Sequence, residues 1–345
     1  MRKRWFVILA LAVTAALVAA CGFSSTGEQG SGEGASSAPA VVKLGLLKNV
    51  THAPALVAIK NGYFQKYLGE NVKLEVIGFD NGSDFSTAMA TGEIDIGFVG
   101  PSPVMNQYVR SKNIKIVSGS NDGGAVLVAR NDSGIAGVKD LNGKVAAIPT
   151  KGSTNEISLR LLLQQEGLQV SSDASGVQLV TMAPANTLIA MKQKQVDFAL
   201  LPEPWGTQIV NEGIGSIVVD WDKIPPNDGN YPLTIIVAND DFLQAHRETA
   251  KAVLRANIDA IDFIQKSPEE TYWIVSEELK ELTGKGLAIE LIKAALDHLS
   301  LTTDVDKGAL EAMAKVAVDA GYMKDTLNVS ELLDLSLLEE IKKEQ

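Results

Sequence analysis

Cysteine is almost absent from this chain of 345 residues, which holds one, Cys21. A single cysteine excludes an internal disulfide and any metal site built from several thiolates. Histidine is also scarce, with three residues. No pattern of carboxylates surrounds His246 or His298, and we expect both of them at the surface. We therefore expect neither a metal nor a cofactor.

Clusters of basic residues and catalytic signatures are missing as well. No cluster of Lys or Arg occurs beyond Arg2-Lys3-Arg4, and the formal charge is −11, so nucleic acid is a poor partner. The sequence has no G-x-S-x-G nucleophile motif, no phosphate-binding P-loop and no H-E-x-x-H zinc motif. Nothing in the sequence therefore indicates catalysis.

A long apolar stretch occurs only at the N-terminus, where three basic residues precede the 16 mostly apolar residues of Trp5–Ala20. The stretch is shorter than the ~20 residues that span a bilayer. A basic start, a short apolar run and small residues at its end are typical of an export signal. The small residues before Cys21 also resemble the lipobox of bacterial lipoproteins.

We therefore expect residues 1–20 to be removed as a lipoprotein signal peptide and Cys21 to become the lipid-carrying N-terminus. An ordinary signal peptide followed by a chance cysteine is the alternative. Five Gly and five Ser lie between Gly22 and Ala40, a composition typical of a flexible linker, so residues 21–40 should hold no fold. A lipid anchor of several chains would tether the protein outside the cytoplasmic membrane, at the cell surface or in the periplasm.

One pattern occurs twice along the chain. Ala88–Pro103 reads A-M-A-T-G-E-I-D-I-G-F-V-G-P-S-P, and Ala190–Pro204 reads A-M-K-Q-K-Q-V-D-F-A-L-L-P-E-P. Each copy has the end of a helix, a turn, a short apolar strand and a new helix start, with Asp95 aligned to Asp197 at an offset of 102. The match extends upstream, where Val42–Leu47, Thr51–Lys60 and Val72–Ile77 correspond to Val145–Ile148, Ser153–Gln165 and Val177–Thr181. The sequence therefore predicts two β-α-β-α-β units of the same plan.

Strands that alternate with helices form parallel sheets. We expect two sheets joined by two extended crossings, Ala125–Ala129 and Leu233–Val237, with a helical pattern from His246 onward. The predicted fold is a two-lobed α/β fold in which each lobe is a mainly parallel sheet flanked by helices. Lobe 1 holds residues 41–129 and 236–345, lobe 2 holds residues 130–235, and the helical C-terminus packs on lobe 1.

The strand ends of this fold carry the residue types of a binding site. Open parallel sheets bind ligands outside the carboxyl ends of their strands. Three strand-end segments open helices, and the unpaired N–H groups and dipole of a helix start favour an anion or a polar oxygen. The candidate ligand-binding residues are Asn49, Thr51, His52, Gly100, Ser102, Gly124, Ser153, Thr154, Glu203 and Trp205.

Some of these residues have a purely structural alternative. Ser102, with Pro103 at the first helical position, could serve only as an N-cap, and so could Ser153 and Thr154. Each such cap is worth about 1 kcal/mol. Capping and ligand contact can also coexist.

His52, Glu203 and Trp205 also have more than one possible role. His52 could donate to an oxyanion, stack on a flat ligand, or be an ordinary residue of a first helical turn. Glu203 would repel a pure anion, so it either belongs to the helix start or accepts hydrogen bonds from an amine, amide or ring N–H of the ligand. Trp205 could pack on a methylene chain or ring, or be buried in the lobe core.

Four runs of residues match motifs of a known family, together with Gly123-Gly124 at a strand start. The runs are H-A-P-A-L-V-A-I-K-N-G-Y-F (His52–Phe64), G-E-I-D-I-G-F-V-G-P-S-P (Gly92–Pro103), G-K-V-A-A-I-P-T-K-G-S-T (Gly143–Thr154) and P-E-P-W (Pro202–Trp205). Over residues 41–280 the chain resembles the periplasmic-type binding proteins of nitrate, sulfonate and taurine importers. The resemblance implies a periplasmic binding protein fold, type II-like, and a non-enzymatic solute-binding protein that serves an ABC permease with its ATPase. We expect the protein to be a monomer.

The resemblance does not choose among the ligands of the family. Three helix starts favour an oxyanion, and Glu203 with Trp205 favours a second feature, so we expect a small organic anion such as an alkanesulfonate or taurine rather than bare nitrate. A thiamine-precursor pyrimidine or other heteroaromatic is the alternative. A pyrimidine-synthesis enzyme of the same fold is a remote one, because its chemistry needs a His and Cys cluster and the lone cysteine lies in the export signal.

Overall fold

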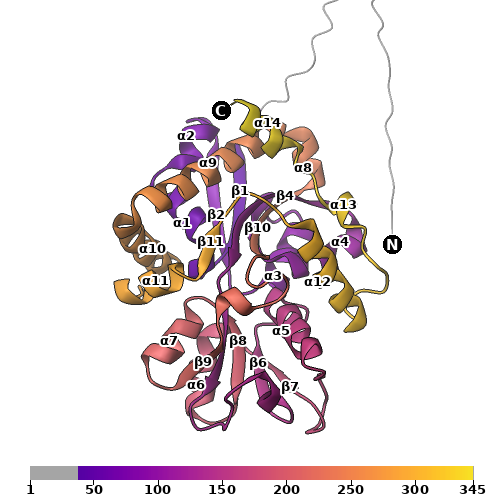
Figure 1. Ribbon diagram of the computed structural model, residues 1–345. Coiled ribbons are helices and arrows are strands. Elements are labelled where there is room, and N and C mark those ends of the chain that lie inside the picture. Colours follow the sequence, from indigo (N-terminus) through magenta and orange to yellow (C-terminus); the bar gives the residue numbers. More distant parts are fainter. Residues whose placement is uncertain (1–37, 345) are drawn as a thin grey trace, which may run out of the picture. The chain divides into compact units, whose positions relative to one another are not determined.

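The structure is a computed structural model that describes residues 38–344 (Figure 1). These residues belong to one compact unit. The predicted signal peptide, the lipidated Cys21 and the linker up to residue 37 lie outside the described residues. Within residues 38–344, every helix is too short or too polar to cross a membrane.

The first sheet has six strands in the order β11-β4-β10-β3-β1-β2. β1 pairs in parallel with β2 and β3, whereas β10 is antiparallel to β3 and β4, and β11 is antiparallel to β4. β1 to β4 therefore run in one direction, which confirms a mainly parallel sheet. The strands are β1 (Val41–Leu47), β2 (Lys73–Phe79), β3 (Ile96–Val99), β4 (Ile114–Gly123), β10 (Pro232–Asn239) and β11 (Leu299–Leu301).

The second sheet repeats this plan in the order β7-β6-β8-β5-β9. β6 pairs in parallel with β7 and β8, and β5 is antiparallel to β8 and β9. Read from β2, the first sheet has the matching order β2-β1-β3-β10-β4, so the predicted duplication is confirmed. The strands are β5 (Ala125–Arg130), β6 (Val145–Ile148), β7 (Gln178–Thr181), β8 (Phe198–Pro202) and β9 (Gly215–Val219).

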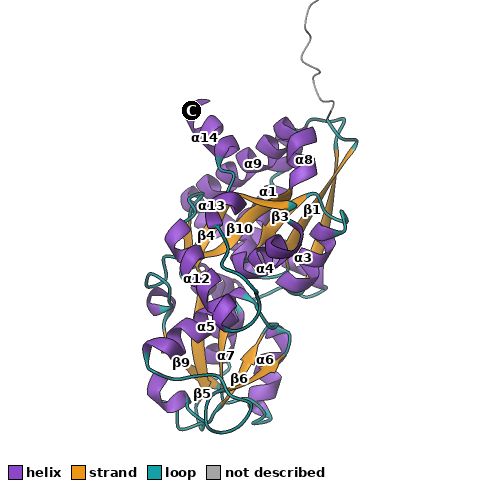
Figure 2. Cartoon of the chain, turned by 90° about the vertical axis from the view of Figure 1, so that its right-hand side faces the viewer, coloured by secondary structure: helices purple, strands orange, loops and turns teal. Residues whose placement is uncertain are grey.

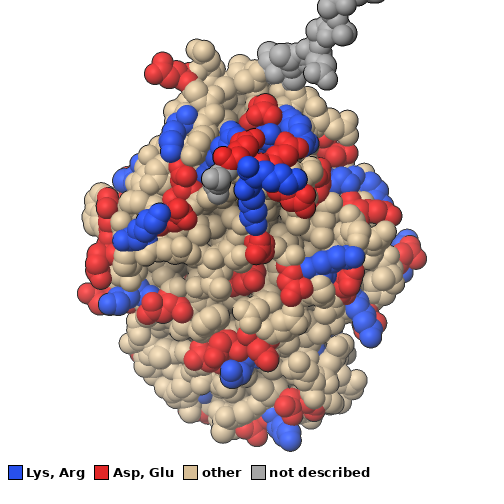
Figure 3. All heavy atoms as spheres, turned by 45° about the horizontal axis from the view of Figure 1, so that its top comes forward, with Lys and Arg blue, Asp and Glu red and all other residues tan. Residues whose placement is uncertain are grey.

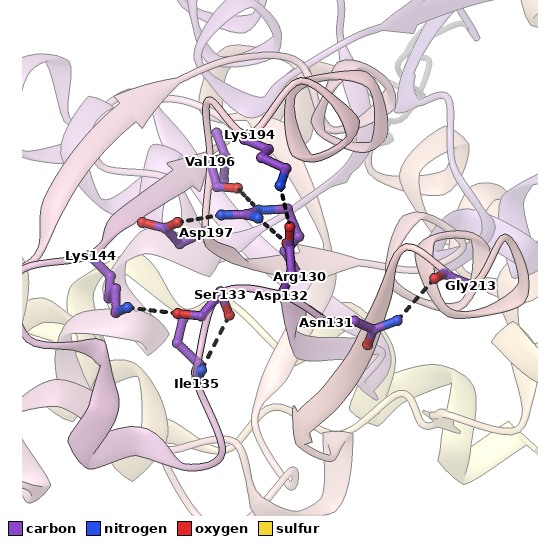
Figure 4. A network of polar contacts seen from close by, with 10 residues as sticks. All are labelled: Arg130, Asn131, Asp132, Ser133, Ile135, Lys144, Lys194, Val196, Asp197 and Gly213. Carbon is purple, nitrogen blue, oxygen red and sulfur yellow. Dashed lines mark hydrogen bonds and ion pairs between the residues drawn. The ribbon is translucent and has the colours of Figure 1, made fainter.

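The aligned residues Asp95 and Asp197 show the duplication at the level of single atoms. The Lys43 N–H donates to Asp95 Oδ2 at 2.8 Å, and the Val145 N–H donates to Asp197 Oδ2 at 2.9 Å. Each carboxylate accepts from a backbone N–H group near the beginning of a strand. That N–H group would be costly to bury without a partner. Figure 4 shows that Asp197 also pairs with Arg130 of β5, at 2.9 Å. The repeated aspartate is therefore structural.

The chain crosses between the sheets at Gly124 and again just before β10. Each crossing strand belongs to the sheet that it enters. β5 pairs with β8 and β9 of the second sheet, whereas β10 pairs with β3 and β4 of the first. The predicted boundary after residue 129 leaves β5 in the wrong sheet, and the boundary after residue 235 cuts β10. We propose two lobes divided near Gly124 and Tyr231, because ladder hydrogen bonds tie each crossing strand to one sheet.

Helices cover both faces of the first sheet. Figure 2 shows α1 (Ala53–Lys60) and α9 (Arg247–Lys266) on one side of its strands, and α3 (Gly82–Ala90) and α4 (Pro101–Ser111) on the other. The other helices up to β10 are η1 (Val50–His52), α2 (Tyr63–Leu68), η2 (Val138–Leu141), α5 (Thr154–Gln165), α6 (Pro184–Lys192), α7 (Trp205–Asn211) and η3 (Trp221–Lys223). Leu44 and Phe98 pack in the cluster that includes α1 and α9, and Phe85 and Val99 pack on the opposite face.

The C-terminal helices follow the predicted helical pattern. α9 buries Ala250, Val253, Leu254 and Ala260 along one stripe, the spacing of an amphipathic helix, and packs on α1 and α2. The remaining helices are α8 (Asp240–Ala245), α10 (Pro268–Thr283), α11 (Ile289–Leu296), α12 (Lys307–Asp319), α13 (Val329–Leu332) and α14 (Ser336–Glu344). α12 contacts α4 and α5, so the C-terminal region touches helices of both sheets.

Ion pairs hold α14 on α9. Lys251 Nζ lies 2.6 Å from Glu340 Oε2, Arg247 also pairs with Glu340, and Arg255 pairs with Glu344. Figure 3, which turns the top of Figure 1 forward, shows basic and acidic side chains mixed over this part of the surface. Opposite charges side by side cancel at a distance, so this face presents no strong field of one sign.

Candidate functional site

A cavity of about 50 Å³ lies between the strand ends of the two sheets, and we call it the inner cavity. Its wall combines the loops after β1, β2 and β3 with the loops after β6 and β7 and the end of β8. These are carboxyl ends of parallel strands, where open α/β sheets bind ligands. Five of the ten predicted binding residues line it: Asn49, Thr51, His52, Gly100 and Thr154.

The loop after β1 is held in place by its own side chains. Asn49 caps η1, and its Oδ1 accepts hydrogen bonds from the Thr51 N–H at 3.0 Å and from the Thr51 hydroxyl at 2.6 Å. The Thr51 carbonyl in turn accepts from the hydroxyl of Thr234 on β10 at 3.1 Å. Asn49 and Thr51 are both buried, so these bonds leave two polar side chains at the cavity wall with little freedom to move.

His52 is neutral in the folded protein. Its side chain is buried, and this burial lowers the pKa of the imidazole to about 3. Nδ1 accepts a hydrogen bond from the Leu47 N–H at 3.3 Å, so the ring proton is carried by Nε2. His52 therefore offers the site an uncharged N–H donor that does not titrate near neutral pH.

The start of α4 meets the start of α5 at the inner cavity. Gly100 is the N-cap of α4 and Pro101 its first residue, so the prediction that Ser102 caps this helix and Pro103 opens it is wrong by two residues. Pro101 fits because the first helical N–H has no partner within a helix. The Ser102 N–H donates to Thr154 Oγ1 at 3.3 Å. A Cβ on Gly100 would lie 2.4 Å from that same oxygen, so the close approach of the two helix starts requires glycine.

The start of α5 confirms one predicted cap and adds one residue. Ser153 Oγ accepts a hydrogen bond from the Glu156 N–H at 3.2 Å, and Thr154 follows as the first helical residue. Asn155 also lines the inner cavity, and its buried Nδ2 has no hydrogen-bond partner within the described part of the chain. An unpaired buried donor costs about 1–3 kcal/mol, which a ligand oxygen would offset. Sequence reasoning missed Asn155, although its place directly after two candidate residues was a signal.

The wall of the inner cavity carries little charge. Among its described lining residues Asp80 alone is charged, and its Oδ1 lies 2.7 Å from Lys48 Nζ. The hydrogen-bond donors at this wall are uncharged groups. The helix α3 also begins at this wall, where its N-cap residue Asn81 lies. The starts of α3, α4 and α5 each add a partial positive charge. A cavity of this volume holds on the order of three to five water-sized groups, so it fits the head group of a small anion.

Glu203 is fully buried, and its carboxylate is used within the protein. Oε2 accepts from the Thr207 N–H at 3.1 Å, and Oε1 accepts from the Thr207 hydroxyl at 2.9 Å. His298 Nδ1 lies 2.7 Å from Oε1. Of the two predicted placements, these contacts correspond to the side chain that belongs to the helix start. A contact between Glu203 and a ligand stays a prediction.

His298 is not the surface residue that the sequence predicts, since its side chain is only 18% exposed. Burial by itself lowers the pKa of His298. The hydrogen bond and the negative charge of Glu203 outweigh this effect, and the pKa is raised above the usual value of histidine. Because His298 follows α11 and Glu203 directly follows β8, the pair links the C-terminal helices to the second sheet.

Gly124 and Trp205 do not line the inner cavity. Gly124 has a φ of +84°, and a Cβ there would lie 3.1 Å from Leu299 Cδ1 and 3.3 Å from Thr51 Cγ2. Glycine suits this crossing because it adopts left-handed backbone without strain. Trp205 opens α7 and lines a second cavity of about 600 Å³. As ligand contacts, the ten candidate residues stay predictions.

Comparison with known proteins identifies relatives of the whole two-sheet region. The model of the NMT1-like family matches residues 35–276. A protein of Brucella abortus (strain 2308) named as a binding protein is 26% identical over 284 residues, which cover 79% of this chain and 83% of that protein. The taurine-binding periplasmic protein of Escherichia coli (strain K12) is 28% identical over 210 residues, 60% of this chain and 62% of that protein.

Among solved structures, the alkanesulfonate-binding protein SsuA from Xanthomonas axonopodis pv. citri, bound to MOPS, superposes with a TM-score of 0.74 at 18% identity. The match covers 86% of this chain and 99% of that one. At this identity it shows the fold, which is that of periplasmic binding proteins. The family model spans more than half of the chain and every residue that lines the inner cavity. The resemblance read from the motifs is therefore confirmed, and the chain belongs to the NMT1-like family.

Proposed function

We propose that the protein is the extracytoplasmic solute-binding component of an ABC importer, which captures a small organic anion and delivers it to a permease with its ATPase. One observation carries this proposal. The strand ends of both sheets and three helix starts meet around one small cavity whose donors are neutral and held in place. Such a site binds an oxyanion by hydrogen bonds and helix dipoles without a charged partner.

The relatives support both a solute-binding role and a location outside the cytoplasm. They are named as taurine-binding, alkanesulfonate-binding and general binding proteins, and one is described as periplasmic. We therefore place this protein outside the cytoplasmic membrane. The small residues before Cys21, which resemble a lipobox, support a lipid tether on that cysteine. In this proposal it acts as a monomer, without catalysis and without a cofactor.

The proposed ligand has an oxyanion head and a small organic body, as in alkanesulfonates and taurine. The volume of the inner cavity suits the head alone. The body would extend toward Trp205, which lines the larger second cavity. Asn49, Thr51, His52 and Thr154 would contact the head, together with the amide of Asn155.

A melting-temperature screen tests the function. The purified protein is heated with ethanesulfonate, taurine, nitrate or a pyrimidine, each over a range of concentrations. We expect the two sulfonates to raise the melting temperature, because a ligand at about a hundred times its dissociation constant adds roughly 2.7 kcal/mol of stability. A shift with the pyrimidine alone, or with none of the four, would contradict the proposal.

Replacing Thr154 with valine is expected to weaken sulfonate binding roughly 10- to 100-fold. The change keeps the shape of the side chain and removes a hydroxyl at the cavity wall, and a hydrogen bond to a charged group is worth about 1.5–3 kcal/mol. Affinity is measured by titration calorimetry at a temperature where both proteins are folded. Thr187→Val is the matched control, since the Thr187 hydroxyl is buried, unpaired among the described residues and away from the cavity wall. Equal losses in both variants would contradict the assignment.

A further inference from the structure

Residues 150–156, at the start of α5, contact helices of the first sheet. The hydroxyl of Ser83 on α3 donates to Thr150 Oγ1 at 3.3 Å, and the Ser102 N–H on α4 donates to Thr154 Oγ1. α3 and α4 pack on strands of the first sheet, whereas α5 packs on β8 of the second. The two lobes therefore meet at this segment, which lies beside the inner cavity.

Glu156 is fully buried in this segment, and its carboxylate accepts three hydrogen bonds. Oε2 accepts from the Gly152 N–H at 2.6 Å. Oε1 accepts from Arg160 Nε at 2.7 Å and from the Tyr322 hydroxyl at 2.6 Å. A buried carboxylate is costly unless such partners surround it. Two of the three donors lie within a few residues of Glu156, and Tyr322 is the one that comes from elsewhere in the chain.

Tyr322 belongs to the first sheet and not to the second. It lies between β11 and α13, and both of these elements contact β4. α12, the helix that leads to Tyr322, packs beside α5 (Figure 2). Burial, followed by the hydrogen bond and the charge of Glu156, raises the pKa of Tyr322 to about 12, so its hydroxyl stays a donor at neutral pH. The bond between Tyr322 and Glu156 therefore joins the two lobes.

This bond, which we call the clasp, lies far from the crossings between the lobes. α12 begins after Asp306, whose Oδ2 accepts a hydrogen bond at 2.7 Å from Asn227 in the loop before the second crossing. α12 has 13 residues and is about 20 Å long, and Tyr322 lies beyond its far end. At about 20 Å from a hinge, a rotation of about 10° moves an atom by up to about 3.5 Å, which breaks a hydrogen bond. Hinge opening of the lobes would therefore open the clasp.

We propose that Tyr322 is a positioning residue for ligand binding, which bonds to Glu156 when the lobes close and releases it when they part. The inference rests on the proposed function and adds a determinant of affinity that does not line the inner cavity. Thr154 and Asn155, which directly precede Glu156, do line that cavity, so the clasp holds them in place against the ligand. Because the bond exists in the closed form and not in the open one, it adds to the affinity of any ligand that closes the lobes.

Replacing Tyr322 with phenylalanine tests the inference, since the change removes the hydroxyl and keeps the ring. A hydrogen bond to a charged group corresponds to roughly 10- to 100-fold in an equilibrium constant. Tyr322→Phe should weaken the binding of ethanesulfonate to the purified protein by about this factor. The loss should lie mainly in a faster dissociation rate, because the clasp forms after the ligand has entered. Titration calorimetry measures the affinity, and stopped-flow fluorescence measures the rates.

Tyr67→Phe is the matched control. The Tyr67 hydroxyl donates to Asp259 Oδ2 at 2.8 Å, a bond of the same kind, but this bond joins α2 to α9 on one side of the first sheet. Its loss should leave the affinity and the dissociation rate unchanged. Denaturant unfolding of the unliganded proteins adds a second measurement. Tyr322→Phe should unfold at nearly the same denaturant concentration as the parent, because the clasp is open without ligand.

The outcomes distinguish this inference from the proposed function. If the parent binds ethanesulfonate and Tyr322→Phe binds it equally well, the clasp is overturned and the inner site is kept. Unchanged affinity with a lower stability of unliganded Tyr322→Phe would show that the bond is a permanent part of the fold. Equal weakening of binding by Tyr67→Phe would also overturn the inference. A parent that binds neither ethanesulfonate nor taurine would overturn the proposed function and this inference with it.

Discussion

Replacing Asp122 with asparagine is expected to stabilise the protein by roughly 2–4 kcal/mol at pH 8, and by less than about 1 kcal/mol at pH 4. Asp122 lies on β4 just before the first crossing between the sheets. Burial, followed by the negative charges of Asp306 and Asp304, raises the pKa of its carboxyl to about 7. Asparagine has nearly the same shape and no charge to bury.

The sign of the pH dependence follows from that raised pKa. The folded state keeps the proton of Asp122 up to about pH 7, whereas the unfolded chain releases it near pH 4. Stability from this group is therefore greatest at pH 4 and below, and it falls as the pH rises from about 4 to 7.

Denaturant unfolding of parent and variant at pH 4, 6 and 8 measures the effect. The gap between the two proteins should widen with pH. Asp319→Asn, at an exposed position of α12, is the matched control and should shift stability by less than about 0.5 kcal/mol at any pH. A gap between parent and Asp122→Asn that stays constant with pH would contradict the assignment.

Replacing Glu203 with alanine is expected to destabilise the protein by roughly 3–5 kcal/mol at pH 6, the cost of leaving one partner of a buried pair alone. The change removes the acceptor of the Thr207 N–H and hydroxyl and the partner of His298. Glu203→Gln keeps an acceptor for Thr207 and loses the charge opposite His298, so it should fall between the parent and the alanine variant.

The contribution of the His298–Glu203 pair should itself depend on pH. The pKa of His298 is raised in the folded state, so the pair stabilises fully below the unfolded value of about 6.5. This stabilisation is lost as the pH rises through the raised folded pKa. Unfolding at pH 6 and pH 9 should therefore show a larger difference between parent and Glu203→Gln at pH 6.

Glu212→Ala is the matched control for both Glu203 variants, because it removes a carboxylate just beyond α7 whose partner, Lys192, is exposed. Exposed ion pairs add little to stability. Equal stability of the parent and the Glu203→Ala variant would show that the contacts of Glu203 with Thr207 and His298 do not stabilise the fold.

The local plan of the fold could be predicted from the residues because its signals are local. Apolar runs between turn residues place β6, whose predicted and observed bounds agree at Val145–Ile148. The N-cap signal of Ser153 depends only on the next three residues. The aligned Asp95 and Asp197 predict equivalent positions, which make equivalent bonds to Lys43 and Val145.

Features that depend on distant parts of the chain could not be predicted in this way. β11 has three residues and exists because it pairs with β4, nearly two hundred residues earlier. The membership of β5 in the second sheet is likewise set by its partners and not by its own sequence. At α4, the contact between Ser102 and Thr154 accompanies a helix start two residues earlier than the local serine signal indicates.

The sequence by itself determined the duplicated α/β plan, the helix starts at the strand ends and five of the residues around the inner cavity, because hydrophobic period and capping act within a few residues. Tertiary structure alone decided what those residues can do. It buried His52, which keeps the imidazole neutral, joined Glu203 to a histidine 95 residues away, and formed a second, larger cavity that shares Asn49 and Asp80 with the inner one. Protonation, burial and cavity size depend on neighbours that only the folded chain brings together.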